Sequence, residues 1–325
     1  MTKYLVTGVA GFIGSSIAHE LVARGETVRG LDDFSTGKRE NIAGLGNKLD
    51  FRETSLLDKA GLAAACAGID YVIHQAALPS VPKSVAEPEL THAVNVNGTL
   101  NLLLASRDAG VKRVVYAASS SAYGESETLP KREDMLPRPI SPYAVQKLTG
   151  EYYMQAFSTV YGLETVCLRY FNIFGPRQDA NSQYSAVLAK FITQMQSGQP
   201  PTIFGDGEQS RDFTFVANAV QANLKACLAP AEAVSGKVFN IATGARFTLN
   251  QTFAMLQKII GYTGPARYAE PRSGDIKHSL ADIALAKKHL GYSPEVGFEE
   301  GLRRTVEWYK AISATSVDMT LATSR

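Results

Sequence analysis

The feature of the sequence that most constrains the fold is a short apolar segment that runs directly into a glycine-rich turn. Residues 3–7 are predicted to form a buried β-strand, and residues 15–24 have a helical pattern. Three glycines lie between them: Gly8, Gly11 and Gly14. This order is typical of a dinucleotide-binding site, because the turn brings backbone amides to a pyrophosphate at the positive end of the helix.

The three glycines have different predicted roles. Gly8 permits the tight turn, Gly11 lets the backbone approach the pyrophosphate, and Gly14 permits close packing of the helix on the strand. The first gap in Gly-x-x-Gly-x-x-Gly is one residue longer than in the usual dinucleotide fingerprint. The alternative is a glycine turn with a structural role only.

Two aspartates end the second predicted strand, residues 27–31. Asp32 lies 18 residues after Gly14, close to where an acidic side chain meets the adenosine ribose in such sites. A carboxylate there accepts a hydrogen bond from the 2′-hydroxyl and repels a 2′-phosphate, so the pattern favours NAD over NADP. The alternative for Asp32 and Asp33 is a pair of solvated loop acids.

The alternation of strands and helices then continues through the first half of the chain. Strands are predicted at residues 69–74 and 111–118, with a helix from about residue 89 to residue 109 between them. The fold class is therefore α/β, with a Rossmann-type doubly wound parallel sheet. Ligands bind beyond the carboxyl ends of such strands, where residues 75–77 and 119–121 lie. His74, at one strand end, is interpreted as structural.

Composition excludes several classes of partner. The net charge of +2 gives no sign of nucleic acid or an anionic membrane as a partner, and no apolar run is long enough to span a bilayer. Cys66, Cys167 and Cys227 match neither a metal-binding spacing nor a disulfide framework, so buried free thiols are expected and no metal is predicted. The expected free thiols fit a reducing compartment, and the N-terminus lacks the layout of a signal peptide. Together they indicate a cytoplasmic protein.

A Tyr-x-x-x-Lys motif lies at the start of a later predicted helix. Pro142 suits the first helical position, and Tyr143 and Lys147 then lie one turn apart on the same face. A phenol is a poor base at neutral pH, but a nearby ammonium favours the phenolate and lowers its pKa. The pair could thus deprotonate a sugar hydroxyl. An isolated motif of this kind is more often an ordinary solvated helix surface.

Taken together, the motifs of the first half resemble those of an extended short-chain dehydrogenase/reductase, specifically a nucleotide-sugar 4-epimerase of the UDP-glucose/UDP-N-acetylglucosamine type. The matching segments occur in the expected order: Thr7-Gly8-x-x-Gly11-Phe-Ile-Gly14, Asp32, His74-x-Ala-Ala77, Asn95-Val-Asn-Gly98-Thr, Ser119-Ser-Ser-Ala-Tyr123-Gly, Tyr143-x-x-x-Lys147 and Leu168-Arg-Tyr-Phe-Asn172.

The resemblance implies roles for the catalytic residues. Tyr143 would be the base, Lys147 its electrostatic partner and ribose anchor, and a serine would bond the sugar O4. The family's catalytic hydroxyl corresponds to Ser119, while Ser121 points to the same side and is kept as a second contact. NAD would be regenerated in each cycle and stay tightly bound.

The resemblance also implies binding residues. Those expected to contact NAD are Gly8, Gly11, Phe12, Ile13, Gly14, Asp32, Asp33, Ser35, Thr36, Gly37, Ser55, Leu56, Gln75, Ala76, Ala77, Tyr143, Lys147 and Phe171. Those expected to contact the UDP-sugar are Ser80, Ser119, Ser120, Ser121, Tyr143, Asn172, Val187, Arg211, Arg246, Arg272, Asp275 and Ser279. In one departure, Thr54-Ser55-Leu56 stands where the family often has Gly-Asp-Ile, which weakens the predicted adenine contact.

The second half is predicted to form a smaller, mixed α/β substrate domain. Residues 1–175 would form the NAD-binding domain, with a return of the chain near residues 213–243, and residues 176–313 mainly the substrate domain. Residues 314–325 are predicted to be a disordered tail. Arg211, Arg246 and Arg272 each follow a turn, and arginine suits a diphosphate because its fork forms bidentate bonds.

Ser279 bears on substrate choice through its size. By the same resemblance, epimerases restricted to plain hexoses carry a bulky tyrosine here, which crowds the C2 substituent of the sugar. A serine leaves room for an N-acetyl group without excluding UDP-glucose. The predicted activity is therefore NAD-dependent, reversible C4 epimerisation of UDP-GlcNAc/UDP-GalNAc, with UDP-Glc/UDP-Gal also accommodated.

Three alternatives to this activity remain. UDP-uronate 4-epimerases would need a cation near C6, which the sequence does not locate. A 4,6-dehydratase is disfavoured, because Ser120 and Ser121 occupy the places of its usual Asp-Glu pair. A non-catalytic NAD-binding scaffold is disfavoured because every catalytic position is filled. The family also implies a homodimer that uses the helix carrying Tyr143.

Overall fold

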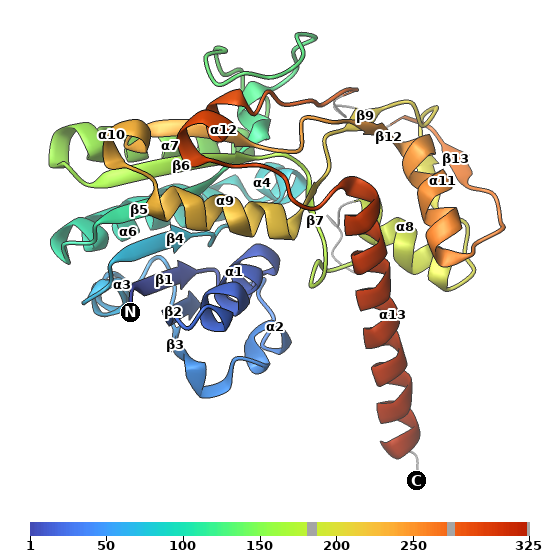
Figure 1. Ribbon diagram of the computed structural model, residues 1–325, viewed down its shortest axis with the longest axis horizontal. Coiled ribbons are helices and arrows are strands. Elements are labelled where there is room, and N and C mark those ends of the chain that lie inside the picture. Colours follow the sequence, from blue (N-terminus) through green and yellow to red (C-terminus); the bar gives the residue numbers. More distant parts are fainter. Residues whose placement is uncertain (181–186, 272–276, 324–325) are drawn as a thin grey trace.

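The computed structural model describes residues 1–180, 187–271 and 277–323, and side chains as far as residue 313. Its centre is a seven-stranded, fully parallel sheet with the order β11-β6-β5-β4-β1-β2-β3 (Figure 1). The predicted Rossmann-type α/β class is confirmed. The strands are β1 (Lys3–Thr7), β2 (Thr27–Asp32), β3 (Leu49–Glu53), β4 (Tyr71–His74), β5 (Arg113–Ser119), β6 (Glu164–Tyr170) and β11 (Lys237–Ile241).

The strand order reverses between β1 and β4. From β1 the chain adds β2 and β3 on one side, and then β4, β5, β6 and β11 on the other. The loops that follow β1 and β4 therefore diverge to opposite faces of the sheet and leave a crevice at their carboxyl ends. This crevice is where a ligand of such a sheet binds.

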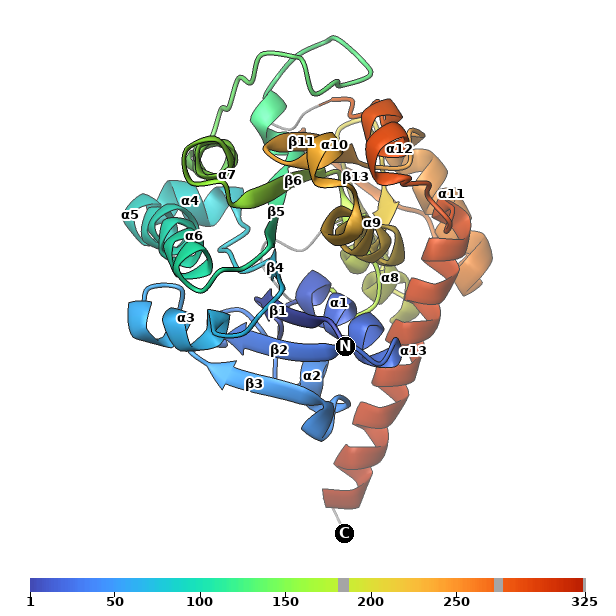
Figure 2. The same cartoon turned by 60° about the vertical axis from the view of Figure 1, so that its left-hand side comes forward.

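Helices cover both faces of the sheet (Figure 2). One face is covered by α1 (Phe12–Ala23) and α9 (Val216–Leu228), and the other by α3 (Lys59–Cys66), α6 (Gly98–Asp108) and α7 (Pro142–Tyr161). Alternate residues of β1 belong to the two cores: Tyr4 and Val6 pack with the α1 face, and Leu5 with the α3 face. Both faces of β1 are thus buried, as is typical of a strand inside a parallel sheet.

The helix predicted from residue 89 to residue 109 is interrupted. It consists of α5 (Pro88–His92), a π-helical segment, η2 (Ala93–Asn97), and α6. Within η2, the buried Asn95 side chain accepts a hydrogen bond from the Leu78 N–H (2.8 Å) and donates to the Gln146 side chain (2.9 Å). Such π-segments often lie at functional sites. This one ties the loop after β4 to α7.

The second half adds a small lobe beside the carboxyl edge of the sheet (Figure 1). It contains three two-stranded pairs and two long helices. The pairs are β7 (Ile173–Phe174) with β10 (Thr214–Phe215), β9 (Ser210–Arg211) with β12 (Phe247–Thr248), and β8 (Thr202–Phe204) with β13 (Arg267–Ala269); the helices are α8 (Val187–Gln196) and α11 (Leu249–Ile260). An aromatic cluster joins this lobe to the rest of the chain. In this cluster, Phe298 stacks on Phe213 and Phe247.

The remaining elements are short, apart from α13. They are α2 (Glu40–Ala43), η1 (Gly46–Lys48), α4 (Val81–Ala86), η3 (Ser120–Tyr123), α10 (Ala231–Val234) and α12 (Ala284–Leu290). Helix α13 (Phe298–Thr323) extends away from the body in Figure 1 and includes residues 314–323, for which the sequence predicts disorder. Residues 302–323 contain neither Gly nor Pro, so nothing in this segment breaks the helix.

Cys66, Cys167 and Cys227 are buried free thiols, as predicted. Of the helices in the described ranges, none has both the length and the apolar character needed to cross a bilayer. In the same ranges, no group of three or more His, Cys, Asp and Glu side chains is arranged to hold a metal ion.

His74 is a structural residue at the end of β4. Its Nδ1 lies 2.8 Å from the Thr7 hydroxyl and its Nε2 lies 3.0 Å from the Thr99 hydroxyl, so it links β4 to β1 and α6. Burial, reinforced by the positive charge of Lys147, lowers the pKa of His74 to about 3 from an ordinary value of 6.5. The ring is therefore neutral in the folded chain.

This neutral ring makes stability depend on pH. Between pH 6.5 and pH 3 the unfolded chain binds a proton at this position that the folded chain does not, so stability falls as the pH falls through that window. We expect His74 to cost about 2 kcal/mol at pH 5 relative to pH 6.5. Urea unfolding at several pH values should show one proton fewer linked to unfolding in His74→Gln than in the unsubstituted chain. The control His92→Gln, at an exposed position, should link as many protons to unfolding as the unsubstituted chain does. If the free energy of unfolding of His74→Gln keeps the pH dependence of the unsubstituted chain, the linked proton does not belong to His74.

Candidate active site

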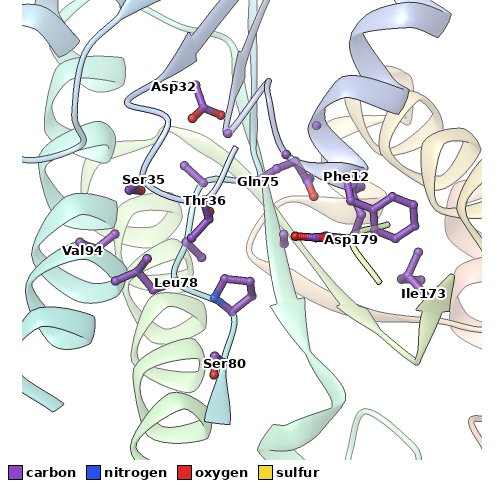
Figure 3. Close-up of a pocket in the computed structure, with 18 of the residues that line it drawn as sticks. Phe12, Asp32, Ser35, Thr36, Gln75, Leu78, Ser80, Val94, Ile173 and Asp179 are labelled. Atoms are coloured by element: carbon purple, nitrogen blue, oxygen red, sulfur yellow. The ribbon is translucent and has the colours of Figure 1, made fainter. Parts of the chain in front are cut away.

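A cavity of about 770 Å³ lies at the carboxyl edge of the sheet. Figure 3 shows Asp32, Ser35 and Thr36 toward one end of this cavity and Ser80 toward the other. Predicted site residues that line it are Gly8, Gly11, Phe12, Ile13, Gly14, Asp32, Asp33, Ser35, Thr36, Leu56, Gln75, Ala76, Ala77, Ser80, Ser119, Tyr143, Lys147 and Asn172. The structure therefore brings both ends of the predicted site, adenosine side and catalytic side, into one space.

The glycine turn is packed so closely that no side chain would fit at Gly8 or Gly14. Gly8 has a φ of +66°, and a Cβ atom there would lie 2.7 Å from the Ala76 amide nitrogen. A Cβ on Gly14 would lie 2.1 Å from the Gly8 carbonyl oxygen, so α1 packs directly on the turn. Close helix packing at Gly14 was the role predicted for it.

Asp32 is buried at the end of β2. Its Oδ2 accepts from the Ala10 N–H (2.8 Å) and its Oδ1 from the Phe34 N–H (2.9 Å). Burial raises the pKa of this carboxyl group, while the hydrogen bonds from Phe34 and Ala10 oppose that shift. Because Ala10 belongs to the glycine turn, the turn itself orients the Asp32 carboxylate. Each carboxylate oxygen keeps a lone pair for a ribose hydroxyl.

Helix α7 places the Tyr-x-x-x-Lys motif against β5. Ser141 caps the helix and accepts from the Ala144 N–H (3.2 Å), and the buried Ser84 hydroxyl of α4 accepts from the Tyr143 N–H (3.0 Å). Both bonds satisfy N–H groups that the first turn of a helix leaves free. The backbone of Tyr143 is therefore tied to α4 as well as to its own helix.

Lys147 is 4% exposed. Its ammonium donates to the Ala117 carbonyl at the end of β5 (2.8 Å) and lies 4.8 Å from the centre of the Tyr116 ring. Burial lowers the pKa of Lys147 to about 8, and the negative charge of Glu151 opposes that shift. The side chain remains mostly protonated at neutral pH.

The pKa of Tyr143 differs from the sequence-based expectation. The expectation was a pKa lowered by Lys147, whereas burial raises the pKa of this phenol and a hydrogen bond with Ser119 opposes the rise. The ammonium of Lys147 donates its hydrogen bond to the Ala117 carbonyl. Ser119 and Tyr143 both line the cavity.

Ser121 contacts Ser119. The Ser121 hydroxyl donates to the Ser119 hydroxyl (2.8 Å), and the Ser121 N–H lies 3.2 Å from the same oxygen. Two donors directed at Ser119 leave its own hydrogen free to point elsewhere. Ser120 and Ser121 themselves lie in η3, outside the residues that line the main cavity.

A second cavity of about 240 Å³ adjoins the first through Asn172 and Ile173, which line both. Val187 and Arg211 line it. Their contacts with the substrate stay predictions. Arg246 precedes β12, which pairs with the strand that carries Arg211.

His278 lies next to the strand that carries Arg211, with its Nδ1 2.9 Å from the Ser210 hydroxyl. Burial lowers the pKa of His278, and the positive charges of Arg246, Lys277 and Arg211 lower it further. His278 is therefore neutral at pH 7. The three flanking cations form an electropositive margin suited to a diphosphate.

Some predicted residues lie behind the cavity walls or beside them. Gly37 packs against the Asp32 carboxylate, Ser55 accepts from the Leu57 N–H in the turn after β3, and Phe171 is buried against Tyr123. Ser279 is half-buried, and its N–H donates to the Ser210 carbonyl (3.0 Å). Arg272 and Asp275 lie outside the described residues. The contacts assigned to these residues stay predictions.

The chain matches the NAD dependent epimerase/dehydratase family over residues 4–242. It belongs to that family. It is 37% identical over 313 residues to the UDP-glucose 4-epimerase of Mycolicibacterium smegmatis, with 95% of this chain and 98% of the relative covered. A UDP-N-acetylglucosamine 4-epimerase from Methanobrevibacter ruminantium M1, solved with UDP-N-acetylmuramic acid, has 41% identity and a TM-score of 0.90, with 95% of this chain and 98% of that chain covered.

A third comparison is with the UDP-glucuronic acid 4-epimerase of Bacillus cereus, solved with UDP-glucuronic acid and NAD. It has 32% identity and a TM-score of 0.88, and 96% of this chain and all of that chain are covered. The predicted extended short-chain dehydrogenase/reductase is thus confirmed, as are the isomerase class and NAD as the cofactor.

The cavity of this epimerase/dehydratase family member fits NAD on its own evidence. The glycine turn and Asp32 lie at one end, and Tyr143 and Lys147 at the other. Arg177 also lines the cavity: one guanidinium nitrogen donates to the Ser16 hydroxyl of α1 (3.0 Å), while its buried Nε has no hydrogen-bond partner among the described residues. An unsatisfied guanidinium nitrogen suits an anion such as the cofactor's diphosphate.

Sequence reasoning missed several polar residues of the cavity. Lys38 and Asp179 lie 3.4 Å apart and connect the loop after β2 to the loop after β7. Lys83, on α4, and Arg177 line the same space. The loop arginine 177 has a φ of +71°, which the sequence gives no sign of. These residues follow no motif, because they come together only through the tertiary fold.

Proposed function

We propose that this chain catalyses reversible inversion at C4 of a UDP-hexose, with UDP-GlcNAc/UDP-GalNAc preferred and UDP-Glc/UDP-Gal also accepted. The observation that carries the proposal is that Ser119, Tyr143 and Lys147 line one cavity. This cavity adjoins the second one, beside which Arg211 and Arg246 lie, through Asn172. A sugar can thus lie at Tyr143 while its diphosphate lies among cations.

The chain's residues have distinct tasks in the proposed reaction. In its phenolate form Tyr143 takes the proton from the O4 hydroxyl, and the Ser119 hydroxyl holds or relays that proton. Lys147 stabilises negative charge on the phenol through its buried ammonium. Bound NAD supplies the acceptor and donor of the C4 hydride. Arg211 and Asn172 hold the diphosphate while the 4-keto sugar turns and presents its opposite face to the same Tyr143.

Holding NAD between turnovers would fall to the adenosine end of the cavity. Asp32 would bond the ribose, and the glycine turn would bind the diphosphate through its backbone. Arg177 would add a charged contact from the other side of the cavity. We therefore expect the purified chain to retain NAD.

A UDP-uronate is the second candidate substrate, because the cavity contains a cation that the sequence did not reveal. Lys83 lines the cavity three residues after Ser80 and next to Ser84, which bonds the backbone of Tyr143. An ammonium there could meet a carboxylate at C6. Activity on UDP-glucuronate that is lost in Lys83→Gln, with UDP-hexose activity retained, would favour this candidate.

We also propose a homodimer through α7. Three apolar residues on one face of this helix are exposed: Val145 (49%), Tyr152 (55%) and Val160 (69%). A helical stripe of this kind on a soluble chain is typical of a covered surface. Sedimentation equilibrium tests the proposal, and a monomer at micromolar concentration would overturn it.

Proton NMR of the 325-residue chain with UDP-GlcNAc and no added NAD tests the proposed function. We expect a new anomeric signal of the galacto epimer that grows to a constant ratio, because retained NAD is recycled. Tyr143→Phe should lower the rate by at least about a hundredfold, because it removes the proton acceptor.

Tyr161→Phe is the matched control for Tyr143→Phe, since Tyr161 ends the same helix, is exposed, and lies on the side of the helix opposite to Tyr152. It should leave the rate within about twofold. Absence of turnover on UDP-GlcNAc, UDP-Glc and UDP-glucuronate, even with NAD added, would contradict the proposed function.

Ser279→Tyr tests the size argument for substrate preference. The larger side chain should lower kcat/KM for UDP-GlcNAc by at least about tenfold and change that for UDP-Glc by less than about threefold. Ser279→Ala, which keeps the space, should retain both activities. Equal losses for the two sugars in Ser279→Tyr would show that Ser279 does not face the C2 substituent.

A further inference from the structure

Asp212 is a completely buried carboxylate between β9 and β10, outside the walls of both cavities. Four donors surround it. Its Oδ1 accepts from the N–H and the hydroxyl of Thr243 (2.9 and 2.7 Å), and its Oδ2 accepts from the Gly244 N–H (3.1 Å) and the Ala281 N–H (3.2 Å). A buried charge is tolerated only with such bonds, so this arrangement is specific to a carboxylate.

The segments that Asp212 joins are far apart in the sequence. One is the turn at residues 243–244, and the other is the segment around residue 281. A third contact runs through the backbone, where the Asp212 carbonyl accepts from the Asn172 side-chain amide (3.2 Å). Asp212 thus connects three parts of the chain that are far apart in the sequence.

Each of these segments carries a residue predicted to bind the UDP-sugar. Arg211 precedes Asp212 directly, Arg246 follows Gly244 by two residues, and Ser279 precedes Ala281 by two residues. Asn172, the fourth residue predicted to bind the UDP-sugar, donates a hydrogen bond to the backbone carbonyl of Asp212. Among the described residues, the donors to the Asp212 carboxylate are Thr243, Gly244 and Ala281. None of these residues belongs to the cofactor side of the site.

We propose that Asp212 is the positioning residue of the UDP-sugar site, which fixes Asn172, Arg211, Arg246 and Ser279 in one arrangement through the segments it joins. This inference rests on the proposed function. Its consequence is that a change at Asp212 alters binding of the UDP part while it leaves NAD in place.

Asp212→Asn tests the proposal with nearly the same shape. An amide keeps one oxygen acceptor, and its NH2 group would face N–H groups that need an acceptor. In the full-length chain with its retained NAD, calorimetry should show UDP bound at least about tenfold more weakly, with KM for the UDP-sugar raised similarly. NAD content should be unchanged and kcat should change by less than about threefold.

The control is Asp282→Asn on the same segment. The Asp282 carboxylate accepts from the Ala284 N–H at the start of α12 (2.7 Å), a role that asparagine performs equally well. UDP affinity should stay within about twofold of that of the unsubstituted chain. If Asp212→Asn does not fold, Thr243→Val removes one of the four donors and should weaken UDP binding by a smaller factor, again with NAD retained.

Two results would overturn the proposal. One is UDP affinity that is unchanged in Asp212→Asn. The other is a loss of NAD content in step with UDP affinity in Asp212→Asn or Thr243→Val, which would show a role in overall stability. If the unsubstituted chain itself fails to bind UDP, the proposed function fails first, so the two failures are distinguishable.

Discussion

The buried ammonium of Lys147 is the constraint on which the arrangement of this site depends. A charge removed from water must find partners, and Lys147 finds the carbonyl of Ala117 and the face of Tyr116, both on β5. One turn along α7, Glu151 is fully paired with Arg169 of β6 by two hydrogen bonds of 2.9 and 2.7 Å. Helix α7 is thereby fixed against two central strands, and Tyr143 has no freedom to leave the strand end where Ser119 lies.

The same helix is also fixed from its other side. Ser84 of α4 bonds the Tyr143 backbone, and Gln146 connects to Asn95 in the π-segment. Asn95 in turn holds Leu78, which lines the cavity. The site is thus rigid on the side of the sheet, where the proton and the hydride must be placed. On the side of the smaller lobe, it depends on the hydrogen bonds to one carboxylate, Asp212.

The parts of this site that the sequence predicts are those in which neighbouring residues act together. The glycine turn, Asp32 after its strand, and Tyr143 with Lys147 one turn later need only local geometry, and all of them line one cavity. The parts that were missed depend on tertiary contacts: Lys38 with Asp179, Arg177 beside α1, and the four donors to Asp212. The expectation of a lowered pKa for Tyr143 was wrong for the same reason, because spacing along a helix does not reveal that the phenol is buried. The π-segment also escaped prediction, since hydrophobic periodicity cannot show one extra residue in a helical turn.

The central claim, that Tyr143 and Ser119 move a proton while the hydrogen on C4 leaves and returns as hydride, is tested most directly by isotopic labelling. UDP-GlcNAc that carries deuterium at C4 is converted in ordinary water, and the product is examined by NMR. The account predicts that the galacto product keeps the deuterium at C4, because a hydride held within the site does not exchange with solvent. Protium at C4 of the product would contradict it, because it would mean that C4 exchanges a proton with water.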